Sequence, residues 1–570
     1  MYKVAKVIII VAKFLVLKVK KWYNLVNTIF KRKKMIKTNE ITEFLPPVRI
    51  IETSETINTE FLVGNAARQV PLGGDKYASV MPKGWVLLDY GAEISGGVRI
   101  LTQIVRSSVF SAKIRIRFGE SATEAMSELG EKNSGNHHST RDFICNVQNL
   151  SEVRLGSTGF RFVRIDNIDE CRIDFLSVQA TYTHSDIKAV GGIVTDDERV
   201  NEILKTAERT LFLNMQNGVL WDGVKRDRLV WAGDMYVEIL TCLYLYGDVE
   251  NVRNSLDMCF ENVKITGWAN TIPSYSLWLA LDLANYFYFT GDKEYLAKSM
   301  SFIDDLIGKL DVCVGSDGKF NPSAYTGHKT NRPYFIDWQT VDNPDNIYAV
   351  EAILRHTLKT IIDIKNALGE DDEKAKKILA RAKKRGVKLT ETKSLNALQV
   401  LFGGATDEAF GKSLLKGGAD GISTFMSYFV LSAMSEAGYI KEAVLVMKEY
   451  FSAMLDLGAT TFFEDFAMKW KDGVFPIYCI GEEGKQDFHG DRGDHCYVGF
   501  RHSLCHGWAS GALPFFTERV LGVNLKTLND KNEAITPLTG IFKKINGKVA
   551  TASGNINVTV DGKNYAVKRG

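Results

Sequence analysis

Residues 221–238 read WDGVKRDRLVWAGDMYVE and hold more chemically active side chains than any other stretch of the chain. Three acids, Asp222, Asp227 and Asp234, alternate with basic residues and two tryptophans. This mixture would make a poor core and would expose apolar area on an open surface, so it is more typical of a cleft. The apolar run that follows Gly233 indicates a buried helix beginning near Asp234, which places the acids on a loop before that helix.

This stretch lies inside a long region of helical periodicity. Residues 196–199 (DDER) are typical of a helix start, and Gly247 marks one of several short turns between apolar helices. Six such hairpins between residues 191 and 525 can close into a ring, an (α/α)6 barrel. The insertions at 311–343 and 457–498 are too long to be turns, and we expect them to line a site.

The region before the barrel favours strands. Apolar and polar residues alternate at 112–118 and 160–165, and further strand-like runs occur at 85–90 and 98–101. Period-two alternation with turns between the runs is typical of a half-buried antiparallel sheet. Residues 48–190 therefore predict a β-sandwich.

Strand-like runs return near the C-terminus. Within residues 526–570 the pairs 546–547 (NG) and 561–562 (DG) are typical of hairpin turns. The fold class that we predict is mainly α with β: an N-terminal basic and apolar extension at 1–47, a β-sandwich at 48–190, an (α/α)6 barrel at 191–525 and a small β unit at 526–570.

The N-terminal extension dominates the charge of the chain. Eleven Lys or Arg precede the first acid, Glu40, and the remainder carries 60 basic against 68 acidic residues. A mildly acidic body argues against nucleic acid as a partner. Lysines interrupt the apolar run at 4–19, so we expect no stable membrane span. Residues 1–34 fit three readings, namely an extension upstream of Met35, a membrane-surface helix or a secretion signal.

The cysteines and histidines bear on location and metal content. Eight cysteines show no C-x-x-C pair, which is typical of reduced core residues in a cytoplasmic protein. Secretion or membrane-surface association through residues 1–34 stays open. The cluster at 489–496 (HGDRGDHC) raises a metal hypothesis but lacks an ordered ligand spacing. We therefore expect neither a metal nor a cofactor, and the sequence leaves a homodimer open.

A second acidic feature lies at residues 458–466, GATTFFEDF, where Glu464 is framed by phenylalanines. An acid in such surroundings is either partly desolvated, which suits it to proton transfer, or a solvated loop residue. Two acidic clusters near aromatics are what glycosidic hydrolysis requires, since one carboxylic acid protonates the leaving oxygen and another activates water. This pairing favours the desolvated reading of Glu464 and a carbohydrate as substrate.

Aromatic residues and histidines fall near the same loops. Asp337 and Trp338 form an acid–aromatic pair on an insertion, which indicates a ligand contact. His502 and His506 are spaced by one helical turn, and His506 is either a sugar contact or a helix-start residue. Six aromatic positions, Trp338 among them, fit either a sugar-stacking platform or the core: Trp268, Tyr275, Trp278, Tyr334, Trp338 and Trp508.

Taken together, the motifs resemble those of the α-L-rhamnosidases of glycoside hydrolase family 78, which are built on an (α/α)6 barrel. The resemblance covers about residues 80–570. The segments that carry it are 89–98 (DYGAEISGGV), 117–120 (RFGE), 159–163 (GFRFV), 222–234 (DGVKRDRLVWAGD) and 458–464 (GATTFFE).

The resemblance implies that Asp227 is the general acid and Glu464 the base that holds the attacking water. Arg226 and Arg228 would orient the other aspartates. The family commonly reads Arg-Asp-Glu-Arg with the Glu as acid, whereas this chain has Asp227 between the two arginines, and Asp is one methylene shorter. Phe463 stands where Trp is commoner. The substrate-binding residues that we predict are Asp222, Arg226, Arg228, Trp231, Asp234, Asp337, Trp338, Phe463 and His506.

We therefore expect an inverting glycoside hydrolase that releases terminal α-L-rhamnose or a related sugar from glycosides or oligosaccharides. One alternative is a non-catalytic carbohydrate-binding protein on the same fold, favoured by the missing Glu in the first motif. Another is a polysaccharide lyase or other glycosidase on a helical toroid, and a lyase would need a Tyr or His base.

Overall fold

The computed structural model describes residues 39–325, 332–529 and 533–570. Residues 1–38 of the predicted extension at 1–47 lie outside these ranges, and the rest of it contains a strand. Within them, no helix combines the length and the apolar character needed to cross a membrane. Residues 40–570 form one compact unit.

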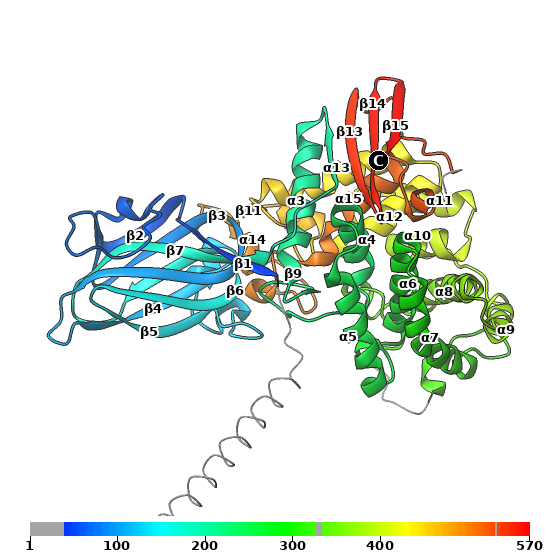
Figure 1. Ribbon diagram of the computed structural model, residues 1–570, viewed down its shortest axis with the longest axis horizontal. Coiled ribbons are helices and arrows are strands. Elements are labelled where there is room, and N and C mark those ends of the chain that lie inside the picture. Colours follow the sequence, from blue (N-terminus) through cyan, green and yellow to red (C-terminus); the bar gives the residue numbers. More distant parts are fainter. Residues whose placement is uncertain (1–38, 326–331, 530–532) are drawn as a thin grey trace, which may run out of the picture. The chain divides into compact units, whose positions relative to one another are not determined.

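The first part of this unit is a seven-stranded antiparallel sheet (Figure 1). Its order is β1-β7-β3-β6-β4-β5, and β2 pairs with β3. The first strand precedes the predicted start of the sandwich at residue 48 and pairs with β7. The strands are β1 (Glu40–Leu45), β2 (Arg49–Ile57), β3 (Ala78–Val105), β4 (Ser111–Gly119), β5 (Asp142–Gln148), β6 (Ser151–Asn167) and β7 (Ile173–Ser185).

A single bent strand makes this sheet fold back on itself. Residues 173–175 of β7 pair with 78–80 and also with 102–105, which are the two ends of β3. The predicted strands at 85–90 and 98–101 are thus two parts of β3, and the sandwich is one curled sheet. Gly96 permits the bend, because a Cβ there would lie 1.7 Å from a backbone oxygen of the neighbouring strand.

The helical part closes into a ring, which confirms the predicted (α/α)6 barrel. Inner helices contact one another in the order α4, α6, α8, α10, α12, and the 3-10 segment at 507–511 closes the circle onto α4. The helices are α3 (Glu198–Asn214), α4 (Met235–Tyr246), α5 (Glu250–Thr266), α6 (Pro273–Thr290), α7 (Lys293–Cys313), α8 (Asn346–Leu368), α9 (Glu373–Ala382), α10 (Lys393–Gly403), α11 (Glu408–Leu415), α12 (Thr424–Glu436) and α13 (Ile440–Asp456).

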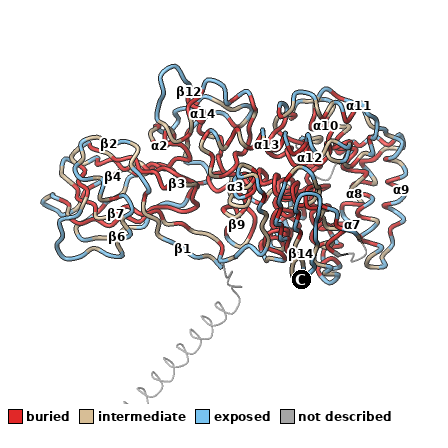
Figure 2. Tube along the Cα trace, turned by 90° about the horizontal axis from the view of Figure 1, so that it is seen from above, coloured by how far each residue is buried: buried red, intermediate tan, exposed pale blue. Residues whose placement is uncertain are grey.

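Burial separates the inner helices from the outer ones. Every residue of α4 is buried, whereas α9 and α11 alternate between buried and exposed positions (Figure 2). A helix that is apolar all round must be enclosed on all sides, which explains why α4 lies in the inner ring. The predicted helix start at 196–199 is confirmed, since the Asp197 side chain accepts a hydrogen bond from Val200 N and α3 begins at Glu198.

The C-terminal strands form a four-stranded sheet in the order β15-β14-β13-β8. The hairpin predicted at 561–562 is confirmed, with residues 562–563 as its turn, but the turn predicted at 546–547 is wrong, because these residues lie within β13. Gly547 instead permits close packing, since a Cβ there would lie 2.5 Å from Leu521 Cδ1. The strands are β8 (Gly192–Thr195), β13 (Lys544–Thr551), β14 (Gly554–Asp561) and β15 (Asn564–Arg569).

Shorter elements connect these parts. The domain boundaries that the sequence places at residues 48, 191 and 526 stay a prediction. The short elements are α2 (Ala122–Met126), β9 (Met215–Gln216), β10 (Val219–Leu220), β11 (Val474–Phe475), β12 (Gln486–Asp487), α14 (Phe488–Asp491), α15 (Ala512–Phe515) and α16 (Leu525–Asn529).

Candidate active site

A small cavity opens where the inner helices begin. Its volume is about 120 Å³, and its lining comes mainly from loops that lead into α4, α6, α8 and the segment 507–511. Both insertions predicted to line a site, 311–343 and 457–498, contribute residues. The lining consists of Asp222, Arg226, Asp227, Trp231, Asp234, Ile272, Tyr275, Arg332, Phe335, Trp338, Glu464, Cys496, Tyr497, Arg501, His506 and Trp508.

Asp222 shapes the loop that carries the charged residues. Its carboxylate accepts hydrogen bonds from the backbone N–H groups of Asp227 (3.0 Å) and Leu229 (2.9 Å), and its carbonyl accepts one from Gly507 N (2.7 Å). Burial raises the pKa of Asp222 to about 7. Asp222 thus lines the cavity and also holds the turn that presents Arg226 and Asp227.

Arg226 links the two candidate catalytic carboxylates. Its Nη2 donates to Glu464 Oε1 (2.7 Å) and Oε2 (2.5 Å), and its Nη1 donates to Asp227 Oδ1 (2.9 Å). Its Nε donates to the carbonyl of Arg501 (3.0 Å), so the guanidinium is held on every side. A buried guanidinium with this many hydrogen bonds is held in one orientation, because its planar donors match these acceptors in that orientation alone.

The geometry of the guanidinium limits the separation of the two carboxylates. Bonds of about 1.33 Å put its two terminal nitrogens about 2.3 Å apart. With the hydrogen bonds above, Asp227 Oδ1 and Glu464 Oε1 are at most about 8 Å apart. The structure therefore brings together the two acids that the sequence predicted as a pair.

Asp227 lies at the rim of the cavity, with 22% of its side chain exposed. Its Oδ1 also lies 3.2 Å from His138 Nε2, on a loop of the curled sheet. Its Oδ2 has no hydrogen-bond partner within the described residues. Sequence reasoning missed His138, because a histidine in a polar loop carries no pattern that points to a residue 89 positions away.

Glu464 is sealed into the wall of the cavity. Its Oε2 accepts from Ser503 N (3.1 Å), and its carbonyl accepts from Trp508 Nε1 (2.8 Å) and the Thr424 hydroxyl (2.6 Å). The side chain is buried, as the desolvated interpretation predicted. Phe463 points elsewhere: it is fully buried in the core, with its ring centroid 5.3 Å from that of Phe488.

A histidine connects Asp234 to Glu464. His506 Nε2 lies 3.2 Å from Asp234 Oδ1, and its Nδ1 lies 3.8 Å from Glu464 Oε1. Burial alone would lower the pKa of His506, but Glu464, Asp222 and Asp234 outweigh it and raise that pKa. Burial also raises the pKa of Asp234, which accepts from Tyr275 Oη at 3.3 Å.

The helix boundary predicted near Asp234 is confirmed, and its side chain binds His506 rather than capping the helix. One local expectation needs correction. His502 and His506 do not share a helix face. His506 forms a β-bridge with Gly223, and this pairing holds it beside the first acidic loop.

Aromatic rings complete the lining. Trp231 packs edge-on against Tyr275 (6.2 Å between centroids), and Trp338 against Tyr497 (6.0 Å). The guanidinium of Arg332 lies 4.3 Å from the Trp338 ring centroid. Of the six aromatic candidates, Tyr275, Trp338 and Trp508 line this cavity, whereas Trp268 and Trp278 are core residues and Tyr334 donates to the carbonyl of Phe320.

Two other predicted binding residues lie outside the lining. Arg228 donates to the carbonyl (2.9 Å) and hydroxyl (3.0 Å) of Ser157, and its guanidinium covers the ring of Trp221. Asp337 accepts from Trp338 N (2.7 Å) and from the Ser423 hydroxyl, and burial raises its pKa to about 6. Residues that sequence reasoning missed are Ile272, Arg332, Phe335, Cys496, Tyr497 and Arg501.

One group of acids and a histidine lies close enough together to consider a metal. Glu120, Glu124 and His489 cluster behind the first acidic loop. The Lys225 ammonium already lies in it, since its Nζ is 2.8 Å from Glu120 Oε2 and 3.2 Å from Glu124 Oε1. The same Nζ donates to two carbonyls, those of residues 500 and 502. The cluster therefore fits a buried ion pair that clamps the loop next to Arg226.

No protein-family model matches the chain, and no curated protein matches it by sequence. Solved structures do match. The rhamnosidase from Klebsiella oxytoca with rhamnose bound is 19% identical, with a TM-score of 0.65 over 86% of this chain and 97% of that one. The GH78 rhamnosidase of Bacillus sp. GL1 is 18% identical, with a TM-score of 0.63 over 86% and 51% of the two chains.

The α-L-rhamnosidase of Streptomyces avermitilis complexed with L-rhamnose is 15% identical, with a TM-score of 0.63 over 92% of this chain and 48% of that one. The chain thus spans about half the length of the Bacillus and Streptomyces proteins and nearly all of the Klebsiella protein. The chain has the fold of the GH78 α-L-rhamnosidases.

Proposed function

We propose that this protein is a glycoside hydrolase that releases terminal α-L-rhamnose, or a closely related sugar, with inversion. The observation that carries the proposal is the bridge made by Arg226, which holds Asp227 and Glu464 on one cavity. Two carboxylates beside a cavity lined with aromatics are the groups that glycosidic hydrolysis uses.

In this proposal Asp227 is the general acid. Its free Oδ2 would carry the proton to the glycosidic oxygen, while Arg226 and His138 fix Oδ1. Glu464 would hold and deprotonate the attacking water from inside the wall. The upper bound of about 8 Å between their oxygens is compatible with the about 6.5 to 9.5 Å of inverting glycosidases and also with the about 5 to 5.5 Å of retaining ones, so the anomer first formed has to distinguish the two.

The sugar would be held by the remaining polar and aromatic lining. Asp222, Asp234 and His506 offer acceptors and a donor for hydroxyl groups, and Trp231 and Trp338 offer apolar faces for a sugar ring. Rhamnose as the sugar is supported by the rhamnose-bound Klebsiella and Streptomyces structures that share this fold. All eight cysteines are free, which supports a cytoplasmic location.

A panel of aryl glycosides tests the proposal. We expect 4-nitrophenyl α-L-rhamnopyranoside to be cleaved, and proton NMR of the first-formed sugar to show the inverted anomer. If Asp227→Asn and Glu464→Gln both retain full turnover, the catalytic assignment is wrong. Cleavage of a different aryl glycoside alone would correct the sugar, and a retained anomer would correct the stereochemistry.

A second candidate function is carbohydrate binding without turnover. The observation in its favour concerns the reach of Asp227. Its side chain is shorter than that of Glu, and nitrogens of Arg226 and His138 both contact its Oδ1, which limits how far the carboxyl group extends toward a substrate. Calorimetric binding of L-rhamnose without product from any aryl glycoside would establish this alternative. An unsaturated product absorbing in the ultraviolet would instead identify a lyase.

A further inference from the structure

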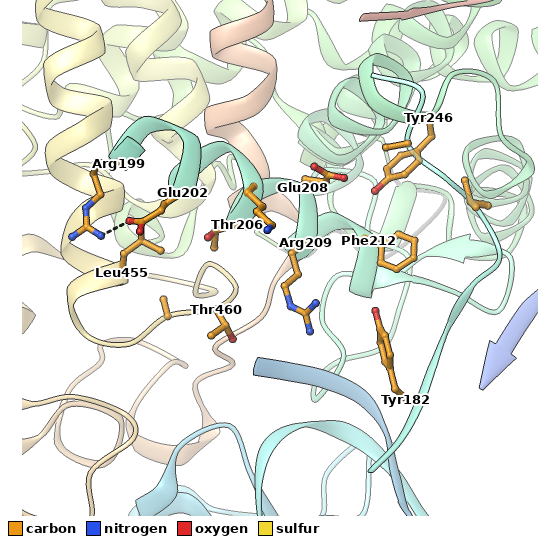
Figure 3. A pocket seen from close by; sticks show the side chains of 14 residues that line it. Tyr182, Arg199, Glu202, Thr206, Glu208, Arg209, Phe212, Tyr246, Leu455 and Thr460 are labelled. Carbon is orange, nitrogen blue, oxygen red and sulfur yellow. Dashed lines mark hydrogen bonds and ion pairs between the residues drawn. The ribbon is translucent and has the colours of Figure 1, made fainter. Parts of the chain in front are cut away.

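A second cavity lies between the curled sheet and the barrel. Its volume is about 620 Å³, and it shares no lining residue with the cavity at Arg226 (Figure 3). Helix α3 supplies one side, and β7, the end of α4 and the end of α13 supply the others. Small-molecule sites typically enclose about 300 to 1,000 Å³, so this cavity has the size of a binding site.

One side of this cavity is an aromatic wall built from three elements. Tyr182 comes from β7, Phe212 from α3 and Tyr246 from α4. The rings of Phe212 and Tyr246 are stacked, with centroids 6.2 Å apart and planes 27° apart. The hydroxyl groups of both tyrosines make no hydrogen bond within the described residues. The wall therefore offers flat apolar faces together with two free hydroxyls.

The polar groups of the cavity are only partly satisfied. Arg209 donates through Nη2 to the carbonyl of Glu93 (2.5 Å), while its Nε is buried and has no partner in the described structure. Figure 3 shows Arg209 extending between Thr460 and Tyr182. Lys205 and Glu208, also on α3, form no ion pair in the part of the chain that the structure describes, and burial raises the pKa of Glu208.

We propose that this cavity is a second binding site and that its ligand is a neutral saccharide. The apolar face of a sugar ring can pack on the aromatic wall, while Arg209 and Lys205 donate to its hydroxyls and Glu208 accepts from them. An anionic ligand is the alternative that the phosphate probe tests, because Arg209 and Lys205 would attract an anion whereas the Glu208 carboxylate would repel it. The proposal goes beyond the proposed hydrolysis and uses none of its residues.

A ligand in this cavity would also contact the chain segment that leads to Glu464. Ala459 and Thr460 line the cavity, and the Thr460 hydroxyl accepts a hydrogen bond from Glu93 N (2.9 Å). The second site therefore adjoins the backbone segment that leads to the candidate base, since Thr460 lines the second cavity and Glu464 lines the first.

Calorimetry on the full chain tests this proposal, with Glu464→Gln introduced to stop turnover. The probes are methyl α-L-rhamnopyranoside, maltose, lactose and inorganic phosphate. Thr206→Trp fills the cavity from α3, and Glu198→Trp adds the same ring to an exposed position of α3 outside the lining. We expect Thr206→Trp to weaken saccharide binding at one site at least tenfold and Glu198→Trp to leave it unchanged.

Lys205→Ala removes an exposed donor without adding bulk, and we expect it to weaken the same binding at least threefold even if Thr206→Trp folds poorly. The proposal is overturned if no saccharide binds, or if Thr206→Trp and Lys205→Ala both bind saccharides like Glu198→Trp. If phosphate binds, no saccharide does, and Thr206→Trp abolishes the phosphate binding, the cavity is a binding site but its ligand is not a saccharide. Hydrolysis by Thr206→Trp in an otherwise unchanged chain should match the parent, so failure here is separate from failure of the proposed hydrolysis.

Discussion

The two acidic loops, residues 222–234 and 458–466, resemble each other in composition but differ in what they present to the cavity. The first turns two acids at its ends, Arg226, Asp227 and Trp231 toward the cavity. The second turns only Glu464 toward it and buries its phenylalanines in the core. Aromatics next to an acid can therefore line a site or anchor its backbone, and the neighbouring elements decide between the two.

The two carboxylates differ in the same way. Glu464 is buried and held through both oxygens, whereas Asp227 lies at the rim with one oxygen free. A base that only positions a water can be rigid, whereas an acid must reach the glycosidic oxygen of a substrate that enters from outside.

Glu464→Gln should lower turnover of a cleaved aryl glycoside by about 10⁴-fold, because the amide cannot deprotonate the water. Steady-state kinetics measure this loss, and calorimetry should show that the sugar still binds. Glu408→Gln, on the outer helix α11, is the matched control and should keep full activity. Turnover within tenfold of the parent would remove Glu464 from the role of base.

Arg226→Met should lower the free energy of unfolding by about 3–5 kcal/mol, because it leaves the Glu464 carboxylate buried without its partner. Urea unfolding measures the loss. Arg228→Met is the control, since within the described residues Arg228 pairs with no carboxylate and donates to Ser157 beside the ring of Trp221, and its effect should be smaller. Equal losses in the two variants would mean that the ion pair between Arg226 and Glu464 adds no stability beyond that of the Arg228 contacts.

Asp227→Asn should lower turnover by about 10²-fold for an aryl leaving group of low pKa, and by more for an alkyl leaving group. The reason is that a poor leaving group needs the proton and a good one does not. Rates across a series of leaving groups measure the dependence. A loss of the same size for every leaving group would show that Asp227 does not protonate the leaving oxygen.

Asp222→Asn should change how stability depends on pH. The pKa of Asp222 is about 7 in the folded protein and 3.8 ordinarily. Between these two pH values the folded state therefore binds one proton more than the unfolded state. The stability of the parent relative to Asp222→Asn should therefore fall as pH rises from 4 to 7, by ~1.4 kcal/mol per pH unit at most. Urea unfolding at pH 5, 6 and 7 measures the slope, and a constant difference would contradict it.

Much of the fold could be predicted because it depends on local periodicity. The alternation at 112–118, the helix start at 196–199 and the apolar run of α4 each specify an element through residues a few positions apart. One exception was the turn predicted at residues 546–547. Gly547 fits a turn by its local sequence, but a side chain packed against β13 requires glycine there.

Individual site residues were harder to predict than the loops that carry them. Arg226 and Arg228 flank Asp227 symmetrically in sequence, yet one bridges the two carboxylates and the other binds Ser157. The direction of each side chain follows from the turn that Asp222 closes with backbone hydrogen bonds. No periodicity in the sequence encodes such a turn.

By itself, the sequence determined that two acidic loops occur on a helical barrel behind a sheet, because periodicity and acid–aromatic clusters are local properties. Only the tertiary structure decided which side chains meet. His138 reaches Asp227 from the sheet, and His506 reaches Asp234 although it follows 272 positions later in the chain. Contacts between residues so far apart in the chain depend on how the elements pack, since each pair forms only when the curled sheet and the closed ring bring their loops together.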